Sequence, residues 1–145
     1  MKFVLDTDVI VAALRSPTGA SAGLLLAAEA GHVSILATVA LCVEYEAVCN
    51  RAEHILASGG TRDDIAAFLD TLVDLVVPVE PWFLWRPQLR DPGDELVLEA
   101  AVNGGADALV TFNRGDYLPA VNSFGIPVLL PGEAIMRLRE SWRRQ

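Results

Sequence analysis

Short apolar runs alternate with helix-forming segments along the whole chain, and this alternation restricts the fold more than any other feature. Each run is short enough for a buried strand, whereas apolar residues recur at helical spacing in the segments between the runs. Strands that alternate with helices predict a mostly parallel central sheet with helices on both faces. The expected strands are Lys2–Asp6, Val33–Ala37, Val76–Val79, Ala108–Thr111 and Val128–Leu130.

The expected helices begin at capping residues and end at glycines or other breaks. Thr7 or Asp8 is placed to cap the first helix, which runs to about Arg15. Thr61 is placed to cap a later helix, and the acids of its first turn suit the helix dipole. The other expected segments are Ala20–Ala30, Val39–Arg51, Arg62–Leu75 (the helix that Thr61 caps), Pro92–Asn103 and Pro131 to about Arg143.

The length and composition predict one small domain without a membrane anchor. The chain has 145 residues, so we expect one domain over residues 1–145. No apolar stretch approaches the roughly 20 residues of a membrane span, and no secretory leader pattern opens the sequence. We therefore expect a cytoplasmic protein. Cys42 and Cys49 fall seven residues apart on an expected helix, too far for a disulfide, so we expect reduced, buried thiols.

The charge balance is acidic, with a net charge of −8. Taken alone, this value argues against a protein that binds nucleic acid through a basic face. The chain also has a single lysine, Lys2, beside ten arginines, which excludes enzyme classes that need a lysine in the site.

Acidic and amide side chains recur where the expected strands end or the following helices begin. Sites in parallel α/β sheets form at the carboxyl ends of the strands, near the point where the strand order reverses. The sheet therefore brings most of these side chains to one edge. The residues are Asp6 and Asp8 after the first strand, Glu44 after the second, Asp94 and Glu95 after the third, and Asn113 and Asp116 after the fourth.

Carboxylates gathered in one cleft need a positive counter-charge. At ~5 Å and an effective dielectric near 20, each pair repels by about 3 kcal/mol. Only Arg90 and Arg114 lie near these acids in sequence, so a divalent cation is the natural counter-charge. Oxygen ligands favour Mg²⁺ or Mn²⁺, and such ions support phosphodiester cleavage. For any one of these acids, a plain helix cap or turn residue is the alternative interpretation.

Four segments resemble PIN domains, and specifically the PIN-family toxins of bacterial and archaeal toxin–antitoxin systems. They occur in the family's order and spacing, and the resemblance covers nearly the whole chain. It implies a three-layer α/β/α sandwich, a metal-dependent RNA endonuclease, an antitoxin partner and a homodimer formed through apolar helix faces. The segments are VLDTDVIVAAL (Val4–Leu14), VEYEAV (Val43–Val48), RDPGDELVLEAA (Arg90–Ala101) and ALVTFNRGDYL (Ala108–Leu118).

The resemblance also implies a role for individual residues. The four catalytic acids that hold Mg²⁺ or Mn²⁺ would be Asp6, Glu44, Asp94 and Asp116. Supporting residues would be Thr111 and Asn113, which shape the last turn, together with Asp8 and Asp91, the latter a competitor to Asp94. The residues expected to meet RNA phosphates are Arg15, Arg90 and Arg114.

The chain departs from the family's pattern at two of these positions. The family commonly has Asn where this chain has Asp8, and it often has Asp where this chain has Asn113. The aspartate adds negative charge that tightens metal binding or merely caps the helix. The asparagine lowers the charge of the site, which bears on whether a second metal ion binds.

Two other functions remain as alternatives. Phosphatases of the haloacid-dehalogenase type place Asp-x-Asp after the first strand, as in Asp6-Thr7-Asp8, but they need a lysine, and Lys2 precedes the strand. A catalytically inactive PIN-like domain would serve as a binding module, against which the acids argue. His32 and His54 stand alone in the sequence, which favours surface or capping roles for both.

Overall fold

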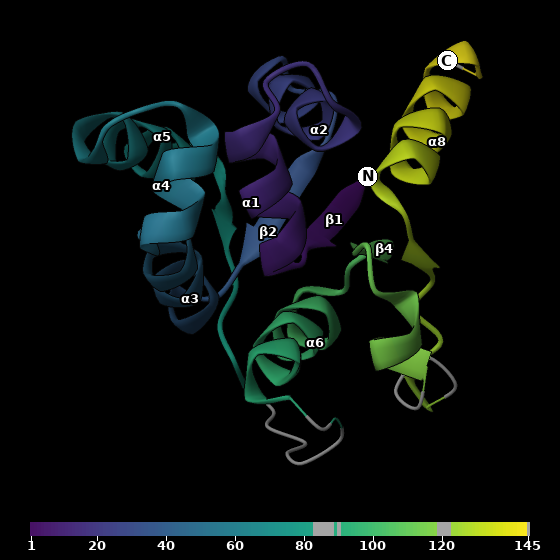
Figure 1. The fold of residues 1–145 in the computed structure, drawn as a ribbon. Helices are drawn as coiled ribbons and strands as arrows, with labels where there is room; N and C mark the ends of the chain where they lie inside the picture. The colour runs from purple at the N-terminus through teal and green to yellow at the C-terminus, as the bar shows by residue number, and fades with distance from the viewer. Residues whose placement is uncertain (83–88, 90, 119–122, 145) are drawn as a thin grey trace.

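The computed structural model describes residues 1–82, 89, 91–118 and 123–144 (Figure 1). Its strands are β1 (Lys2–Leu5), β2 (Ser34–Ala37), β3 (Val77–Pro78), β4 (Ala108–Val110) and β5 (Val128–Leu129). Its helices are α1 (Thr7–Arg15), α2 (Ala20–Glu29), α3 (Val39–Cys49), α4 (Ala52–Ser58), α5 (Arg62–Leu75), α6 (Pro92–Gly104), the short 3₁₀ helix η1 (Arg114–Tyr117) and α8 (Pro131–Arg143).

The five strands form one parallel sheet in the order β3-β2-β1-β4-β5. The chain builds outward from β1 through β2 to β3 and then returns to the other side of β1 with β4 and β5. The strand order therefore reverses between β1 and β4, where Leu5 pairs with Val110. Ligand sites in such sheets lie outside the carboxyl ends of the strands at this reversal.

Helices cover both faces of the sheet, which confirms the expected three-layer α/β/α sandwich. Helix α6 packs against β1, β2 and β4, and α2 packs against α1 and α8 (Figure 1). The side chains between the layers are apolar and fully buried, including Phe3 on β1, Ile35 on β2, Leu24 on α2 and Leu138 on α8. Burial of each such side chain contributes about 1.5–3 kcal/mol, so this core holds the carboxyl ends of β1 and β4 in a fixed relation.

The expected helix ends are confirmed at several points and wrong at two. Thr61 and Asp64 form a reciprocal capping box at the start of α5. The first helix is capped by Asp6, whose side chain accepts from the Thr7 amide, and not by Thr7 or Asp8. The helix expected over Val39–Arg51 ends at Cys49.

A separate helix, α4, follows α3 and was not expected. Arg51 has extended backbone angles, which break the helical path and start α4 in a new direction. Helix α4 contains no fully buried residue, so the apolar periodicity that predicts helices is weak there.

The expected cysteine state is confirmed in part. Both thiols are free; Cys49 is buried, but Cys42 is only half-buried. In the described ranges, no single helix is long and apolar enough to cross a membrane, and α1 with α2 meets that test only as a pair bent by 95°.

Candidate functional site

Asp6 stands at the reversal of strand order, where the carboxyl ends of β1 and β4 lie side by side. It follows the buried strand β1 directly, and its amide donates to the carbonyl oxygen of Val110 on β4 over 2.8 Å. Its carboxylate accepts from the Thr7 amide and from the Thr111 hydroxyl, each over 2.7 Å. Asp6 is buried, with 7% of its surface exposed. A carboxylate this buried is fixed in place and poorly hydrated.

Asp8 lies in the first turn of α1 and binds the segment that follows β4. Its Oδ2 accepts from the Phe112 amide over 3.1 Å and from the Asn113 side-chain amide over 2.9 Å. The Thr111 hydroxyl, 3.4 Å away, also faces this oxygen. Asp8 Oδ1 is buried and has no hydrogen-bond partner among the described residues. The backbone amide of Asn113 also donates to the Thr111 hydroxyl over 3.0 Å, so these two residues and Asp8 form one hydrogen-bonded group, and their supporting role at a metal site stays a prediction.

Asp94 and Asp91 both open α6, but they have different partners. The Asp91 side chain caps the helix by accepting from the Gly93 amide over 2.7 Å. Asp94 accepts from the Tyr117 hydroxyl over 3.2 Å. Tyr117 is fully buried and is not among the predicted site residues. A buried tyrosine hydroxyl needs a hydrogen-bond partner, and this need is the signal that could have identified Tyr117.

Glu44 reaches the same region from α3. A side-chain carbon added to Gly93 would lie 3.5 Å from Glu44 Oε1, so the Glu44 carboxylate lies beside the first turn of α6. The neighbouring Tyr45 is buried, and its hydroxyl donates to the carbonyl oxygen of Leu5 at the end of β1. The position of α3, and with it Glu44, is therefore coupled to the strand that carries Asp6.

These acids line one cleft of about 700 Å³, which we call the acidic cleft. Asp116, exposed on η1, is not among the residues that line it, although its charge raises the pKa of both Asp6 and Asp94. The residues that line the cleft are Asp6, Thr7, Asp8, Val11, Ala12, Arg15, Ser16, Glu44, Val48, Arg51, His54, Asp91, Gly93, Asp94 and Phe112.

Burial and mutual repulsion raise the pKa of Asp6, Asp8 and Asp94. Burial raises the pKa of Asp6, against the hydrogen bond from Thr111. Burial, followed by the charge of Asp6, raises the pKa of Asp8 to about 6. Burial also raises the pKa of Asp94 to about 6, with further increases from the charges of Asp6 and Asp91. In the described part of the chain, no arginine or lysine forms an ion pair with any of these acids.

Basic residues line the cleft beside the acids, though not all of those expected. Arg15 lines it as expected, and Arg51 and His54 line it from the start of α4. His54 is thus half-buried at the cleft, which corrects the expected surface role. Arg114 instead forms an ion pair with Glu133 of α8 over 3.0 Å. Arg90 lies outside the described residues.

The sequence does not place Arg51 and His54 at the cleft, because α4 has no buried apolar residues that would predict it. That helix packs against α1 and so brings both residues to the cleft. The other lone histidine, His32, packs its ring against Trp142, with the ring centroids 4.4 Å apart. His32 is exposed, which agrees with the expected surface role.

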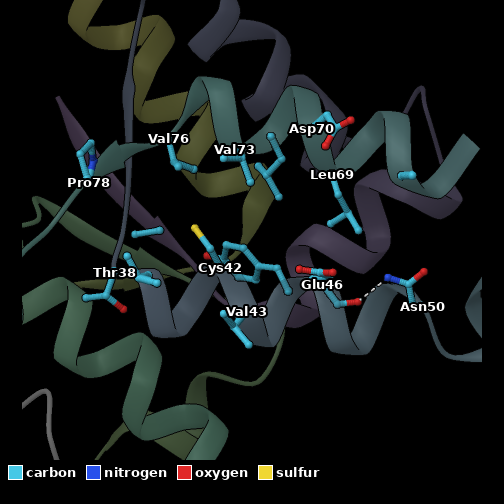
Figure 2. Close-up of a pocket in the computed structure, with 15 residues that line it drawn as sticks. Thr38, Cys42, Val43, Glu46, Asn50, Leu69, Asp70, Val73, Val76 and Pro78 are labelled. Atoms are coloured by element: carbon cyan, nitrogen blue, oxygen red, sulfur yellow. Dashed lines mark hydrogen bonds between the residues drawn. The ribbon is translucent and has the colours of Figure 1, made fainter. Parts of the chain in front are cut away.

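A second hollow, of about 540 Å³, lies between α3 and α5 on the other side of α3 (Figure 2). It is lined mainly by apolar residues such as Val43, Leu69 and Val76, and its acidic side chains are Glu46 and Asp70. None of the predicted site residues lines it. The predicted chemistry therefore concentrates in the acidic cleft.

A family model of the PIN domain matches residues 2–115. The chain belongs to the PIN-domain family. PIN domains are generally nucleases and generally use divalent metal ions. Among solved structures, this PIN domain is similar to VapBC2 from Rickettsia felis bound to a DNA fragment from their promoter. The TM-score is 0.59 and the identity 15%, over 89% of this chain and 97% of the other. Comparison with curated proteins gives no match.

The residues of the cleft fit a divalent metal ion in kind. The donors are carboxylate oxygens, which Mg²⁺ and Mn²⁺ prefer, and Asp8 Oδ1 is a buried oxygen without a partner among the described residues. Within the same residues, no three acidic, histidine or cysteine side chains are close enough to hold one ion directly. A Mg²⁺ ion is commonly held by one or two carboxylates and keeps several waters, so these residues would hold it partly through water.

Proposed function

We propose that this PIN domain is a metal-dependent endoribonuclease and the toxin of a toxin–antitoxin pair. The observation that carries the proposal is the convergence of Asp6, Glu44 and Asp94 on one cleft. They come from three segments far apart in sequence, and the cleft lies where the strand order reverses. Family membership supports nuclease chemistry, and the choice of RNA as substrate is our proposal.

In the proposed site, Asp6, Glu44 and Asp94 hold Mg²⁺ or Mn²⁺, in part through water, and Asp116 adds negative charge nearby. When bound, such an ion would supply an activated water and charge stabilisation for the leaving oxygen of a phosphodiester. The protein's own contribution is to fix the carboxylates. The Thr111 hydroxyl holds Asp6 Oδ2 and the Tyr117 hydroxyl holds Asp94 Oδ1, so each keeps one orientation.

The RNA strand is proposed to lie along the basic wall of the cleft. Arg15 and Arg51 are exposed there, and neither forms an ion pair with a described residue, so both are available for phosphates. Arg114 reaches RNA only after leaving Glu133. Because the net charge is −8, we expect weak RNA binding that falls steeply with salt.

The proposed partners are an antitoxin and a second copy of the chain, in the cytoplasm. The similar structure from Rickettsia felis is described as VapBC2, which supports an antitoxin for this chain. Large apolar side chains are exposed on two helices, with Leu26 at 60% and Val39 at 79%. A partner that covers them would bury apolar surface, at about 25 cal/mol per Å².

The test is cleavage of a mixed pool of single-stranded and structured RNA with Mg²⁺, with Mn²⁺, or with a chelator. We expect metal-dependent cleavage by the wild type and at least a hundredfold less by Asp6→Asn. Asp74→Asn makes an equal charge change at an exposed position of α5. This variant serves as the control and should cleave RNA at the wild-type rate. Cleavage by Asp6→Asn at the wild-type rate would show that the site assignment is wrong.

One observation favours a second function, a catalytically inactive PIN-like binding module. As described above, no three potential ligands of the described residues meet around one point. Such a module would bind RNA equally well with a chelator and with Mn²⁺, and it would cleave nothing. The phosphatase alternative has no support, because the chain belongs to the PIN-domain family.

A further inference from the structure

The end of α8 carries a basic surface on an otherwise acidic protein. Residues 137–144 contain four arginines and one acid, a charge of +3, so the rest of the chain carries −11. On the opposite side of the helix, Ala134 and Leu138 are fully buried and anchor α8 in the core. The four arginines, which we call the α8 basic face, are all exposed: Arg137, Arg139, Arg143 and Arg144.

The fold alone does not account for the α8 basic face. None of its arginines forms an ion pair with a described residue. Arg139 and Arg143 lie four residues apart and are neighbours on the helix surface, where like charges destabilise a helix. The helix dipole favours positive charge only in the last turn, which accounts for Arg143 and not for Arg137 or Arg139. These side chains are therefore available to an anionic ligand.

An aromatic pair borders the α8 basic face. The ring of Trp142 packs against that of His32, with the ring centroids 4.4 Å apart and the ring planes inclined by 50°. Trp142 nevertheless keeps 38% of its surface exposed, and it lies three residues after Arg139, which makes the two side chains neighbours on the helix. Arginines that contact phosphates and aromatic rings that stack on bases are the elements that bind single-stranded nucleic acid.

The α8 basic face lies away from the acidic cleft. Helix α8 begins beside η1, where Glu133 pairs with Arg114, and it ends beside His32, which precedes β2. Its 13 residues span about 20 Å, from the carboxyl ends of the strands toward their amino ends. The end of α8 and helix α6 accordingly lie at opposite ends of the molecule (Figure 1). A ligand on this face would not depend on the acids of the cleft.

We propose that the α8 basic face binds single-stranded RNA and so holds the substrate of the acidic cleft at a second point. This inference rests on the proposed ribonuclease function. The carboxylates of the cleft repel phosphates, whereas the arginines of α8 attract them without any metal ion. An acidic protein segment would match the arginines but would leave the stacking surface of Trp142 unused. Contacts to phosphates and base faces carry little sequence information, so this binding should be largely independent of sequence.

The test is binding of a labelled oligouridine, measured by fluorescence anisotropy in a chelator so that no metal-dependent cleavage occurs. The oligouridine has about 20 nucleotides, more than the roughly 4–16 that comparable sites hold. In Arg139→Gln/Arg143→Gln we expect about tenfold weaker binding at ~0.1 M salt. The slope of log affinity against log salt should fall by about 1.4, because each lost phosphate contact on a single strand contributes about 0.7.

Arg62→Glu is the matched control, because it makes the same change of two charges at one exposed position of α5. It should bind oligouridine with the affinity and salt dependence of the wild type. All three substitutions are at exposed positions, so the variants should melt at the wild-type temperature.

Trp142 provides a readout that net charge alone would not change. The sequence has three tryptophans, and in protein labelled with 5-fluorotryptophan the signal of Trp142 is the one missing from Trp142→Phe. We expect oligouridine to shift this fluorine signal, and polyglutamate, which offers charge without bases, to leave it in place.

Two results would overturn the inference. One is a double variant that binds oligouridine with the affinity and salt dependence of the wild type. The other is wild-type protein that binds polyglutamate more tightly than oligouridine, with that binding lost in the double variant, which would assign the α8 basic face to an acidic protein segment.

This inference and the proposed function can fail separately. RNA binding that is lost in the double variant, together with no cleavage by the wild type in Mg²⁺ or Mn²⁺, would support the α8 site and contradict the ribonuclease. Metal-dependent cleavage by the wild type, together with unchanged RNA binding in the double variant, would refute the α8 site and leave the ribonuclease standing.

Discussion

Without metal, the folded protein should become less stable as the pH rises from about 4 to about 7. The folded-state pKa values of Asp8 and Asp94 are both about 6, above the value of 3.8 for an exposed aspartate. A carboxyl group whose pKa is raised on folding binds more protons in the folded than in the unfolded state. Its contribution to stability is therefore complete below the unfolded pKa and is lost as the pH passes the folded pKa.

The size of this effect follows from the difference in pKa. A shift of about two units corresponds to roughly 3 kcal/mol at about 1.4 kcal/mol per unit. Both side chains are partly exposed, and solvent screening reduces such energies. We therefore expect about 1–2 kcal/mol of lost stability from each group between pH 4 and pH 7.

The assay is urea unfolding at several pH values in a chelator, with Asp94→Asn compared with the wild type. As the pH rises across this range, the free energy of unfolding of Asp94→Asn should increase by about 1–2 kcal/mol relative to that of the wild type. The control Asp74→Asn should follow the wild type. A difference between Asp94→Asn and the wild type that stays constant with pH would refute the reasoning.

Three further outcomes are expected. Thr111→Val removes the hydroxyl that donates to Asp6 Oδ2 and should lower stability at pH 7 by about 2 kcal/mol, the usual value for a hydrogen bond to a charged group; unchanged urea unfolding would contradict this. Arg51→Ala should weaken RNA binding in a filter assay and reduce the salt dependence of that binding by about one phosphate contact. Arg114→Ala breaks a surface ion pair and should change RNA affinity less. Gly104→Ala should cost about 1–3 kcal/mol of stability, because the added carbon would lie 2.8 Å from Leu36 Cδ1; a melting temperature equal to that of the wild type would show that this contact relaxes freely.

The sequence predicted the fold well because its signals are local. The capping box at the start of α5 requires only that Asp64 lies three residues after Thr61. The strands β1 and β2 likewise follow from short runs of neighbouring apolar residues. The positions of Asp6 and Glu44 in one cleft followed from the rule for parallel sheets. Their catalytic role stays a prediction.

Arg51 and the Asn113–Asp8 pair depend instead on how distant segments pack. Arg51 reaches the cleft because α4 turns back onto α1, and no periodicity marks that turn. The hydrogen bond between Asn113 and Asp8 joins residues 105 positions apart. The ion pair of Arg114 with Glu133 is also a tertiary contact, which is why Arg114 was expected at the cleft.

The hydrogen bond from Tyr45 to the carbonyl of Leu5 has a consequence for local motion. It fastens α3 to the innermost strand, so Glu44 cannot swing away while the strand stays paired. The amides of β1 and of the middle of α3 should then exchange with deuterium together, as one cooperative unit. Any step that loosens the cleft on that side would have to disturb the centre of the molecule. Helix α4, on the other side, contributes no fully buried residue to that centre.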